Sequence, residues 1–466
     1  MPAFSYLHDL ALSTQLHQSA IERLRPLMAP ASIALVGASA RPDSFGRAML
    51  EMALGAGFSG AVYPVNPRYD AHAGQSFYAS LADIPETPEH VVLAVANERL
   101  ESEMQRALER GARALTVFAT AADTELHARI RERAQRAGVP ICGANSMGFH
   151  NLELGLRVTP FPAPLDLHTG GVALIVQSGS IMGALAHNDK RIRFNLLVST
   201  GAETTTTAAD YLHWALHQPS TRVVGLFLET VRDPDNFCAA LAIAAERNIP
   251  VVLLKVGRTE ASARMAISHT GALVGDHSVF SAVVARFGAH LVDTVDELAA
   301  TLQVFAQSRN AVGVGIASIH DSGGERELFA DLADDIGVPY ASISERTQAR
   351  LVEHLEPGLE PDNPLDAWGS GRDAANSYRE CALALIEDEA VAAGVYVLDW
   401  RQDYYLHQMH AGVLIEVAAH CSKPFIAATN YSLDCARSRS ALHSELLAYV
   451  MATPRDQGAP IDCVPS

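Results

Sequence analysis

Lysine is almost absent from this chain of 466 residues, which contains only Lys190, Lys255 and Lys423. Arginine supplies most of the 35 basic residues, which face 53 acidic ones and leave a formal net charge of −18. No basic tract interrupts this acidic balance, so we do not expect a nucleic-acid surface. An anionic small ligand would have to be bound locally, by backbone amides or by a few arginines.

Several targeting and metal signals are also missing. The six cysteines form no C-x-x-C pair and have no histidine cluster beside them, so we expect no metal site. We interpret them as reduced thiols of a cytoplasmic protein. The first residues lack the basic segment and apolar core of a signal peptide. No apolar stretch reaches the roughly 18 residues of a membrane span, so no membrane association is expected.

The composition is that of a folded protein with large hydrophobic cores. Apolar residues make up 48% and charged residues 19% of the chain, which argues against disorder. At the usual domain size of roughly 100–200 residues, the length predicts about three domains.

Short β-branched runs alternate with helical patterns along the chain. The strand candidates are nearly continuous apolar runs, as expected for parallel strands covered on both faces. They lie at 32–38, 61–66, 90–95, 114–120 and 140–145, then at 171–177, 195–201, 223–229, 251–257 and 289–294, and finally at 312–321, 338–344, 394–400 and 424–430. This βαβ order predicts an α/β fold with mostly parallel, doubly wound sheets.

Three sheets in tandem suggest three domains, at residues 1–156, 157–308 and 309–466. The proline-rich stretch RVTPFPAPLDLHTGG, residues 157–171, is interpreted as a linker between the first two. The segments LIVQSGSIMGALAH and IASIHDSGGERELFADLA share a strand, a Ser-Gly pair and a helix. This weak repeat suggests that the second and third domains have the same topology.

The turn after the first strand candidate carries two glycines. In VGASARPDSFGRAMLEMA, Gly37 ends the strand and Gly46 lies near the start of a helix. Glycine turns and helix N-termini present backbone N–H groups to phosphate. The spacing is not the G-x-G-x-x-G of NAD enzymes. The turn is either a plain βα connection or a site for another nucleotide-like ligand, to which Arg41, Arg47 and Arg68 could add charge.

The end of the second strand candidate, YPVNP, also lacks a feature of NAD-binding sites. A doubly wound sheet usually binds the adenosine half of a dinucleotide here, and an acidic residue holds the ribose in NAD enzymes. This sequence has Asn66 instead. An NAD-dependent oxidoreductase is therefore disfavoured.

A second candidate site is QSGS at residues 177–180. A strand ends at Gln177 and a helix starts at about Ser180. The hydroxyl groups of Ser178 and Ser180, with the free N–H groups of the turn, suit a phosphoryl group. The alternative is that Ser178 only caps the helix.

Two further side chains could take part in phosphoryl transfer. Glu229 ends the strand VVGLFLE, and a carboxylate there could hold one nitrogen of an imidazole. His269 lies in SHTGALVGD, where small residues permit mobility and close approach. A neutral imidazole is a good phosphoryl acceptor near neutral pH. Taken alone, Glu229 could be a solvated strand-end residue and His269 could cap the following helix.

Together these segments resemble the α subunit, or α portion, of nucleoside-diphosphate-forming acyl-CoA synthetases, typified by ADP-forming acetyl-CoA synthetase. The α subunit of succinyl-CoA synthetase is similar more distantly. The resemblance covers most of the chain. It is carried by VGAS with VYPVNP, by LIVQSGS, by FLETVRDPDNF and by the block LLKVGRTEASARMAISHTGALVGDHSVFSAVVARFGAHLVDTVDEL.

The resemblance implies a Rossmann-like CoA-binding domain followed by two flavodoxin-like domains. It implies that His269 is transiently phosphorylated, that Glu229 orients it, and that the turn Ser178–Gly179–Ser180, with Gly271, binds the phosphate. The glycines Gly271 and Gly275 are expected hinges of a mobile loop. The CoA-binding residues implied are Gly37, Ala38, Ser39, Arg41, Gly46, Val65, Asn66, Pro67 and Asn145.

The reaction implied is the ligation of a carboxylic acid to CoA with conversion of ATP to ADP and phosphate, through an acyl phosphate and a phosphohistidine. In this family ATP or ADP, with Mg²⁺, binds to an ATP-grasp module, either fused or on a β subunit. We find no such module in the 466 residues. A complete enzyme then needs a partner chain, unless this sequence is a fragment of a longer fusion, and an oligomer is expected.

Four loops depart from the family pattern. The third strand ends in Val95-Ala96 rather than Val-Pro, and GANSMG at 143–148 replaces GPNCxG. The loops ATAADT and STGAETTTTAAD also differ, and all of these lie near the acyl end in the family. The alternative function is therefore a catalytically inactive regulatory protein that binds CoA or acyl-CoA. The joint presence of His269, Glu229 and QSGS favours the enzyme.

Overall fold

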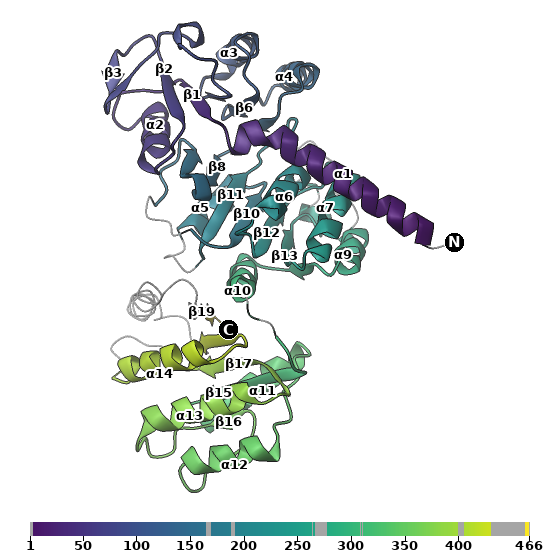
Figure 1. Ribbon diagram of the computed structural model, residues 1–466, viewed down its shortest axis with the longest axis vertical. Helices are drawn as coiled ribbons and strands as arrows, with labels where there is room; N and C mark the ends of the chain where they lie inside the picture. The colour runs from purple at the N-terminus through teal and green to yellow at the C-terminus, as the bar shows by residue number, and fades with distance from the viewer. Residues whose placement is uncertain are drawn as a thin grey trace. The chain divides into compact units, whose positions relative to one another are not determined.

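The computed structural model describes residues 3–164, 169–187, 192–262, 264–265, 277–307, 309, 311–398, 405–429 and 462–465. The chain divides into two compact units, Met1–Leu302 and Gln303–Ser466. The first unit contains two of the three main sheets, and the second unit contains the third (Figure 1). The expectation of an α/β fold with mostly parallel sheets is confirmed.

The first sheet is parallel throughout, with the strand order β2-β1-β5-β6-β7. Every residue of β1, β5 and β6 is buried, because helices cover both faces. Its strands are β1 (Ser32–Val36), β2 (Ala61–Val65), β5 (His90–Leu93), β6 (Ala114–Val117) and β7 (Ile141–Gly143), and its helices are α2 (Phe45–Gly55), α3 (Asn97–Glu109) and α4 (Thr124–Ala137). A two-stranded ribbon, β3 (Ala71–His72) with β4 (Gln75–Ser76), follows β2.

The second sheet has seven strands in the order β14-β13-β12-β10-β11-β8-β9. Its five parallel strands are β10 (Val172–Val176), β11 (Phe194–Ser199), β12 (Val223–Leu228), β13 (Val251–Lys255) and β14 (His290–Val292). The hairpin of β8 (Gly148–Asn151) and β9 (Leu156–Val158) adds to β11 in antiparallel orientation. Its helices are α5 (Gly179–Ala186), α6 (Ala208–His217), α7 (Pro234–Glu246), α9 (His277–Arg286) and α10 (Val295–Ala306).

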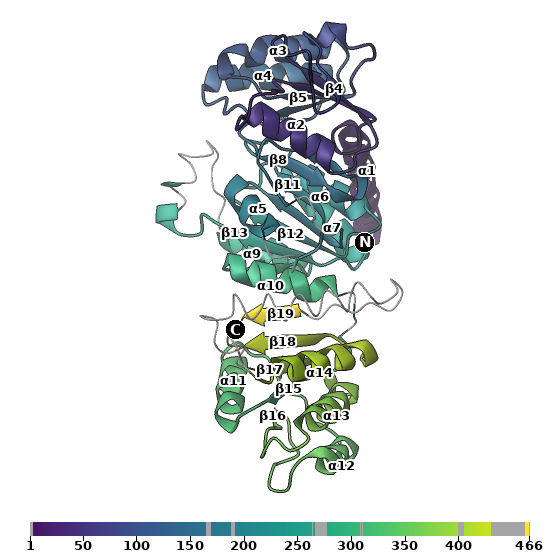
Figure 2. The ribbon, with the colours of Figure 1, turned by 90° about the vertical axis from the view of Figure 1, so that its left-hand side faces the viewer.

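The first two sheets share one hydrophobic core. Buried side chains of β1 and α2, such as Leu35 and Met49, belong to the same cluster as Ile175 and Leu226 of the second sheet. Helix α1 (Ala3–Met28) packs against α6 and α7 and contributes to this core (Figure 2). Within the described part of the chain, no helix is both long and apolar enough to cross a membrane.

The third sheet forms the second unit, with the parallel order β16-β15-β17-β18-β19. Its elements are β15 (Gly315–His320), α11 (Gly323–Asp335), α12 (Glu345–His354), β16 (Leu365–Asp366), α13 (Ala374–Glu387), β17 (Val391–Val397), α14 (His407–His420), β18 (Phe425–Thr429) and β19 (Asp462–Pro465). Counting only the parallel strands, all three sheets have the flavodoxin-like order 2-1-3-4-5. The weak repeat therefore does reflect a shared topology.

Two sequence-based expectations were wrong in detail. Residues 338–344 form no strand: Tyr340 makes a single bridge to Ile316, and Ser344 already caps α12. The position beside the end of β15 is taken by β16. The predicted linker at 157–171 begins inside β9, because Arg157 and Val158 pair with β8. The boundaries at 156 and 308 stay a prediction.

Buried neutral histidines make the fold sensitive to acid. His90 and His150 are 0% and 1% exposed, and burial lowers the pKa of each to about 3. In the unfolded chain a histidine takes up its proton near pH 6.5. Above pH 6.5 both histidines are neutral in the folded and in the unfolded chain, and they cost the fold nothing. As the pH falls from 6.5 toward 3, protonation favours the unfolded chain, and the free energy of unfolding decreases. At pH 5 the loss is about 2 kcal/mol for each histidine.

We expect the free energy of unfolding, measured by urea denaturation with far-UV circular dichroism, to fall between pH 7.5 and pH 5. In His90→Gln this fall should be smaller by about 2 kcal/mol, because one titrating group is gone. His187→Gln, at an exposed position of the same unit, is the control and should keep the wild-type fall. An unchanged pH dependence in His90→Gln would contradict this account.

Candidate functional site

The turn after β1 is shaped by two close backbone approaches. Gly37 has φ +95°, and a Cβ there would lie 2.2 Å from the carbonyl oxygen of Ala94. A Cβ on Gly46 would lie 2.1 Å from the carbonyl oxygen of Gly37. Only glycine fits at either position, so the start of α2 comes directly against the end of β1. The backbone N–H groups of the turn therefore lie at the N-terminus of α2, where a phosphate-bearing ligand can bind.

The end of β2 lies beside this turn because β1 and β2 are parallel neighbours. Asn66 donates from Nδ2 to the carbonyl oxygen of Ala38 over 2.7 Å, and its Oδ1 accepts from the Arg68 amide. The Ser39 hydroxyl lies 3.1 Å from the Tyr69 hydroxyl and accepts from the Arg41 amide. These bonds fix the shape of the turn.

The structure brings eight of the nine predicted CoA-binding residues together around this turn. Their exposure differs, since Ala38, Ser39 and Val65 are buried whereas Arg41 and Pro67 are exposed. Asn145 stands apart, beyond the end of β7, with β5 and β6 between it and β1. It is exposed, has φ +53° and lies at the same carboxyl edge of the sheet. The exposed guanidinium of Arg41 and the turn amides fit an anionic CoA.

At the second sheet, parallel pairing of β10 with β12 brings QSGS beside Glu229. Val176 is paired with Phe227, and the Gln177 amide donates to the Phe227 carbonyl over 3.0 Å. Both strands then end at the same edge, where α/β sheets bind ligands. Two of the predicted groups, the Ser-Gly-Ser turn and the carboxylate-bearing residue, are therefore close together.

The Ser-Gly-Ser turn is the N-terminus of α5. Ser178 is the N-cap residue, but its side chain caps no backbone amide and its Oγ lies 3.1 Å from that of Ser180. The simple capping role is therefore not observed. A Cβ on Gly179 would lie 2.5 Å from Cγ of Met147, a residue of the loop between β7 and β8. Glycine is needed here because Met147 packs directly on the helix start.

The backbone of Glu229 is held on both sides. Oε1 of Gln177 accepts from the amides of Glu229 and Thr230 at 2.5 and 2.9 Å. Nζ of Lys255 donates to the Glu229 carbonyl over 2.8 Å and to the Val256 carbonyl over 2.6 Å. Burial lowers the pKa of Lys255. The sequence did not reveal this role of Lys255, although a lysine ending an apolar strand in a chain with three lysines was a usable signal.

A buried acid, Glu203, lies behind Gln177. It is 4% exposed and has φ +53°, a left-handed conformation that costs a residue with a side chain about 1–2 kcal/mol. Burial raises the pKa of its carboxyl to about 7, against the opposing hydrogen bond from Gln177 and the charge of Arg232. No sequence pattern pointed to Glu203, which stands in the departing loop STGAETTTTAAD.

The predicted phosphoryl carrier lies outside the described residues. His269, Gly271 and Gly275 fall in the segment 266–276, so their place relative to Glu229 stays a prediction.

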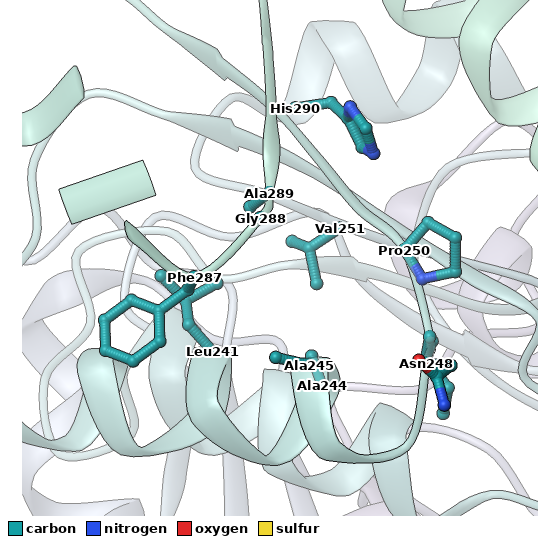
Figure 3. A pocket seen from close by; sticks show the side chains of 11 residues that line it. Leu241, Ala244, Ala245, Asn248, Pro250, Val251, Phe287, Gly288, Ala289 and His290 are labelled. Carbon is teal, nitrogen blue, oxygen red and sulfur yellow. The ribbon is translucent and has the colours of Figure 1, made fainter. Parts of the chain in front are cut away.

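A separate hollow of about 360 Å³ opens at the opposite edge of the second sheet (Figure 3). It is lined by residues that include Leu241, Val251, Phe287 and His290. Val251 and His290 are the first residues of β13 and β14, so the hollow lies at the amino ends of these strands. Ligands of parallel sheets bind at the carboxyl ends, and we therefore do not include the hollow in the site.

Two family models match the chain in the regions just described. A CoA binding domain matches residues 31–151, and a succinyl-CoA ligase like flavodoxin domain matches residues 169–305. The first contains the Gly37 turn, and the second contains QSGS, Glu229 and His269. An α subunit of ADP-forming acetate–CoA ligase II from Pyrococcus furiosus is 27% identical over 370 residues, which cover 78% of this chain and 79% of that subunit.

The chain is therefore similar to nucleoside-diphosphate-forming acyl-CoA synthetases in both of these regions. Two longer relatives are each 28% identical to this chain. A trans-feruloyl-CoA synthase from an unknown prokaryotic organism aligns over 80% of this chain and 54% of its own length. An ADP-forming acetate–CoA ligase from Methanocaldococcus jannaschii aligns over 74% and 49%. The chain thus spans about half the length of these two relatives.

The fold is also similar to that of a solved acetyl-coenzyme A synthetase. An acetyl-coenzyme A synthetase of Candidatus Korarchaeum cryptofilum, solved with phosphate and ADP, superposes with a TM-score of 0.80. The two chains are 23% identical, and the match covers 93% of this chain and 99% of the other.

The contact between Gly179 and Met147 gives a matched pair of substitutions in α5. Gly179→Ala should lower the melting temperature, because the added methyl group displaces Met147 from a packed position. Gly183→Ala should raise it, since the nearest atom lies at 3.9 Å and alanine is favoured in a helix by about 1 kcal/mol. Equal changes in the two variants, measured by differential scanning fluorimetry, would contradict the packing described here.

Proposed function

We propose that this chain is the α component of an ADP-forming acyl-CoA synthetase, an acid–thiol ligase that joins a carboxylic acid to CoA. The observation that carries the proposal is the meeting of the Ser178–Ser180 turn and Glu229 at one sheet edge, in a chain whose family model also spans His269. The cofactor turn at Gly37 and Gly46 supports CoA binding by the first sheet.

The proposed chemistry at His269 is a phosphoryl transfer. The neutral imidazole attacks the phosphorus of an acyl phosphate, a P–N bond forms, and the P–O bond to the departing carboxylate breaks. The other ring N–H stays protonated and donates to the Glu229 carboxylate, which stabilises the positive charge on the ring. The amides and hydroxyls of Ser178–Ser180 stabilise the phosphoryl oxygens. Transfer to ADP then breaks the P–N bond and forms ATP, and every step is reversible.

The remaining component is a partner chain. We propose that ATP or ADP, with Mg²⁺, binds to an ATP-grasp module on a β subunit, because relatives of similar length are named α subunits. The complete enzyme is then an oligomer. Among the residues that the structure describes, Cys142, Cys238, Cys381 and Cys421 are free thiols, which fits the reducing cytoplasm as the location of the protein.

Phosphorylation of His269 is the direct test of the proposed function. We expect wild-type protein to acquire acid-labile, base-stable label from acyl [³²P]phosphates such as acetyl and benzoyl phosphate, and His269→Ala to acquire none. Absence of label on the wild type, or equal label on His269→Ala, would instead support the regulatory CoA-binding protein. A screen of carboxylic acids with the reconstituted pair would then identify the substrate.

Glu229→Gln tests the orienting carboxylate. We expect phosphorylation to slow by about 10- to 100-fold, which corresponds to about 1.4–2.8 kcal/mol of transition-state stabilisation. The melting temperature should hardly change, since Glu229 is half-buried and its backbone bonds are kept. Equal initial rates in the two proteins would remove Glu229 from the mechanism.

A further inference from the structure

The side-chain amide of Gln177 has all of its hydrogen-bonding capacity in use. Its oxygen accepts from the amides of Glu229 and Thr230, and its nitrogen donates to the Thr230 carbonyl and to Oε1 of Glu203, both over 2.8 Å. A primary amide has two donors and two acceptor sites. The orientation of Gln177 is therefore determined, because a flipped amide would face N–H groups with its own NH₂ and oxygens with its own oxygen.

Glu203 holds the nitrogen of the Gln177 side-chain amide. Its Oε1 accepts from Nε2 of Gln177 at 2.8 Å, and from the Thr200 hydroxyl and the Ala208 amide, both at 3.1 Å. Its Oε2 is buried, accepts no hydrogen bond from the described residues and lies 3.8 Å from Nε of Arg232. The left-handed backbone conformation of Glu203 is unfavourable for a residue with a side chain. It is therefore maintained by the contacts around it.

Two other roles for Glu203 are less consistent with the structure. Helix α6 already has a capping box, in which the Thr207 amide and hydroxyl donate to Asp210 at 2.8 and 3.1 Å. Glu203 is therefore not needed as its only cap. The hollow beside Glu203 measures about 10 Å³, room for about one water molecule. This hollow therefore has no room for a substrate, and the Glu203 side chain is buried.

We propose that Glu203 is a positioning residue for phosphoryl transfer: through the Gln177 amide it fixes the peptide groups from which the Glu229 side chain projects. The same loop also touches the first sheet. A Cβ on Gly201 would lie 2.2 Å from the carbonyl oxygen of Ala144, and the Ala202 amide donates to that oxygen over 2.8 Å. The loop thus joins the segment that carries Asn145 to the backbone of Glu229.

This proposal rests on the proposed function, and it is tested on the full chain with acetyl and benzoyl [³²P]phosphate. We expect Glu203→Ala to slow phosphorylation of His269 by about 10- to 100-fold, because a displaced orienting group costs rate rather than binding. The concentration of acyl phosphate that gives half-maximal rate should stay within about twofold. Glu203→Gln keeps an acceptor oxygen for Gln177 and should restore most of the rate.

Two further variants separate positioning from general stability. Thr207→Ala weakens the start of α6 without touching Gln177, so it should lower the melting temperature but keep the rate. In a Gln177→Leu background, Glu203→Ala should cause little further loss of rate. Glu203 acts through the side-chain amide of Gln177, and the leucine has already removed that amide.

The results distinguish the two proposals. If wild type is not labelled, the proposed function fails. If wild type is labelled and Glu203→Ala matches its rate, or loses no more than Thr207→Ala at equal loss of stability, only the positioning role is overturned. Additive losses in the Gln177→Leu background would also overturn it.

Discussion

Parallel hydrogen bonding between β10 and β12 places the ends of both strands at one edge of the second sheet. The register pairs Val176 with Phe227, so Gln177, which follows β10, and Glu229, which follows β12, can meet through a side chain. A shift of one residue would turn every side chain to the opposite face. The buried apolar residues of both strands prevent such a shift, and the core thereby determines the geometry of the proposed site.

The same strand order recurs in all three sheets, and it explains why the two candidate sites lie at the carboxyl end of the first strand of their sheets. In a 2-1-3-4-5 sheet the chain reverses direction at the first strand, and a crevice opens there at the carboxyl ends. The Gly37 turn follows the first strand of sheet one, and QSGS follows the first strand of sheet two. Both candidate sites therefore occupy the equivalent place in their own sheets.

The sequence was most informative where apolar runs end. Nearly all buried strands were found because both of their faces are covered and their residues are continuously apolar, as in β5 and β12. Short pairings such as β8, β9 and β16 were missed, since strands of two to four residues carry no periodic signal. Residues 338–344 show the opposite error: they have strand-like composition, but tertiary pairing assigned most of that position to β16.

The candidate site also contains residues that the sequence predicts and residues that it does not. Ser178, Gly179 and Glu229 could be found because each lies within three residues of the end of a strand, and their proximity follows from strand pairing. The residues that support them could not be found in this way. Gln177 and Lys255 form hydrogen bonds to backbone groups far away in the sequence, and Glu203 accepts one from the side chain of Gln177. Such bonds depend on loop conformations that no local pattern encodes.

The shared core of the first two sheets limits how this chain could exchange parts with its relatives. Phe149, Leu156 and Val158 belong to the hairpin that extends the second sheet, yet they pack in one cluster with Leu35 and Met49 of the first. The side chain of Asn151 also donates to the Met28 carbonyl of α1 over 2.9 Å. A recombination event between the two sheets would separate these partners and expose apolar surface on both halves. In this chain, the CoA-binding and flavodoxin-like parts of the first unit are thus expected to fold together rather than one by one.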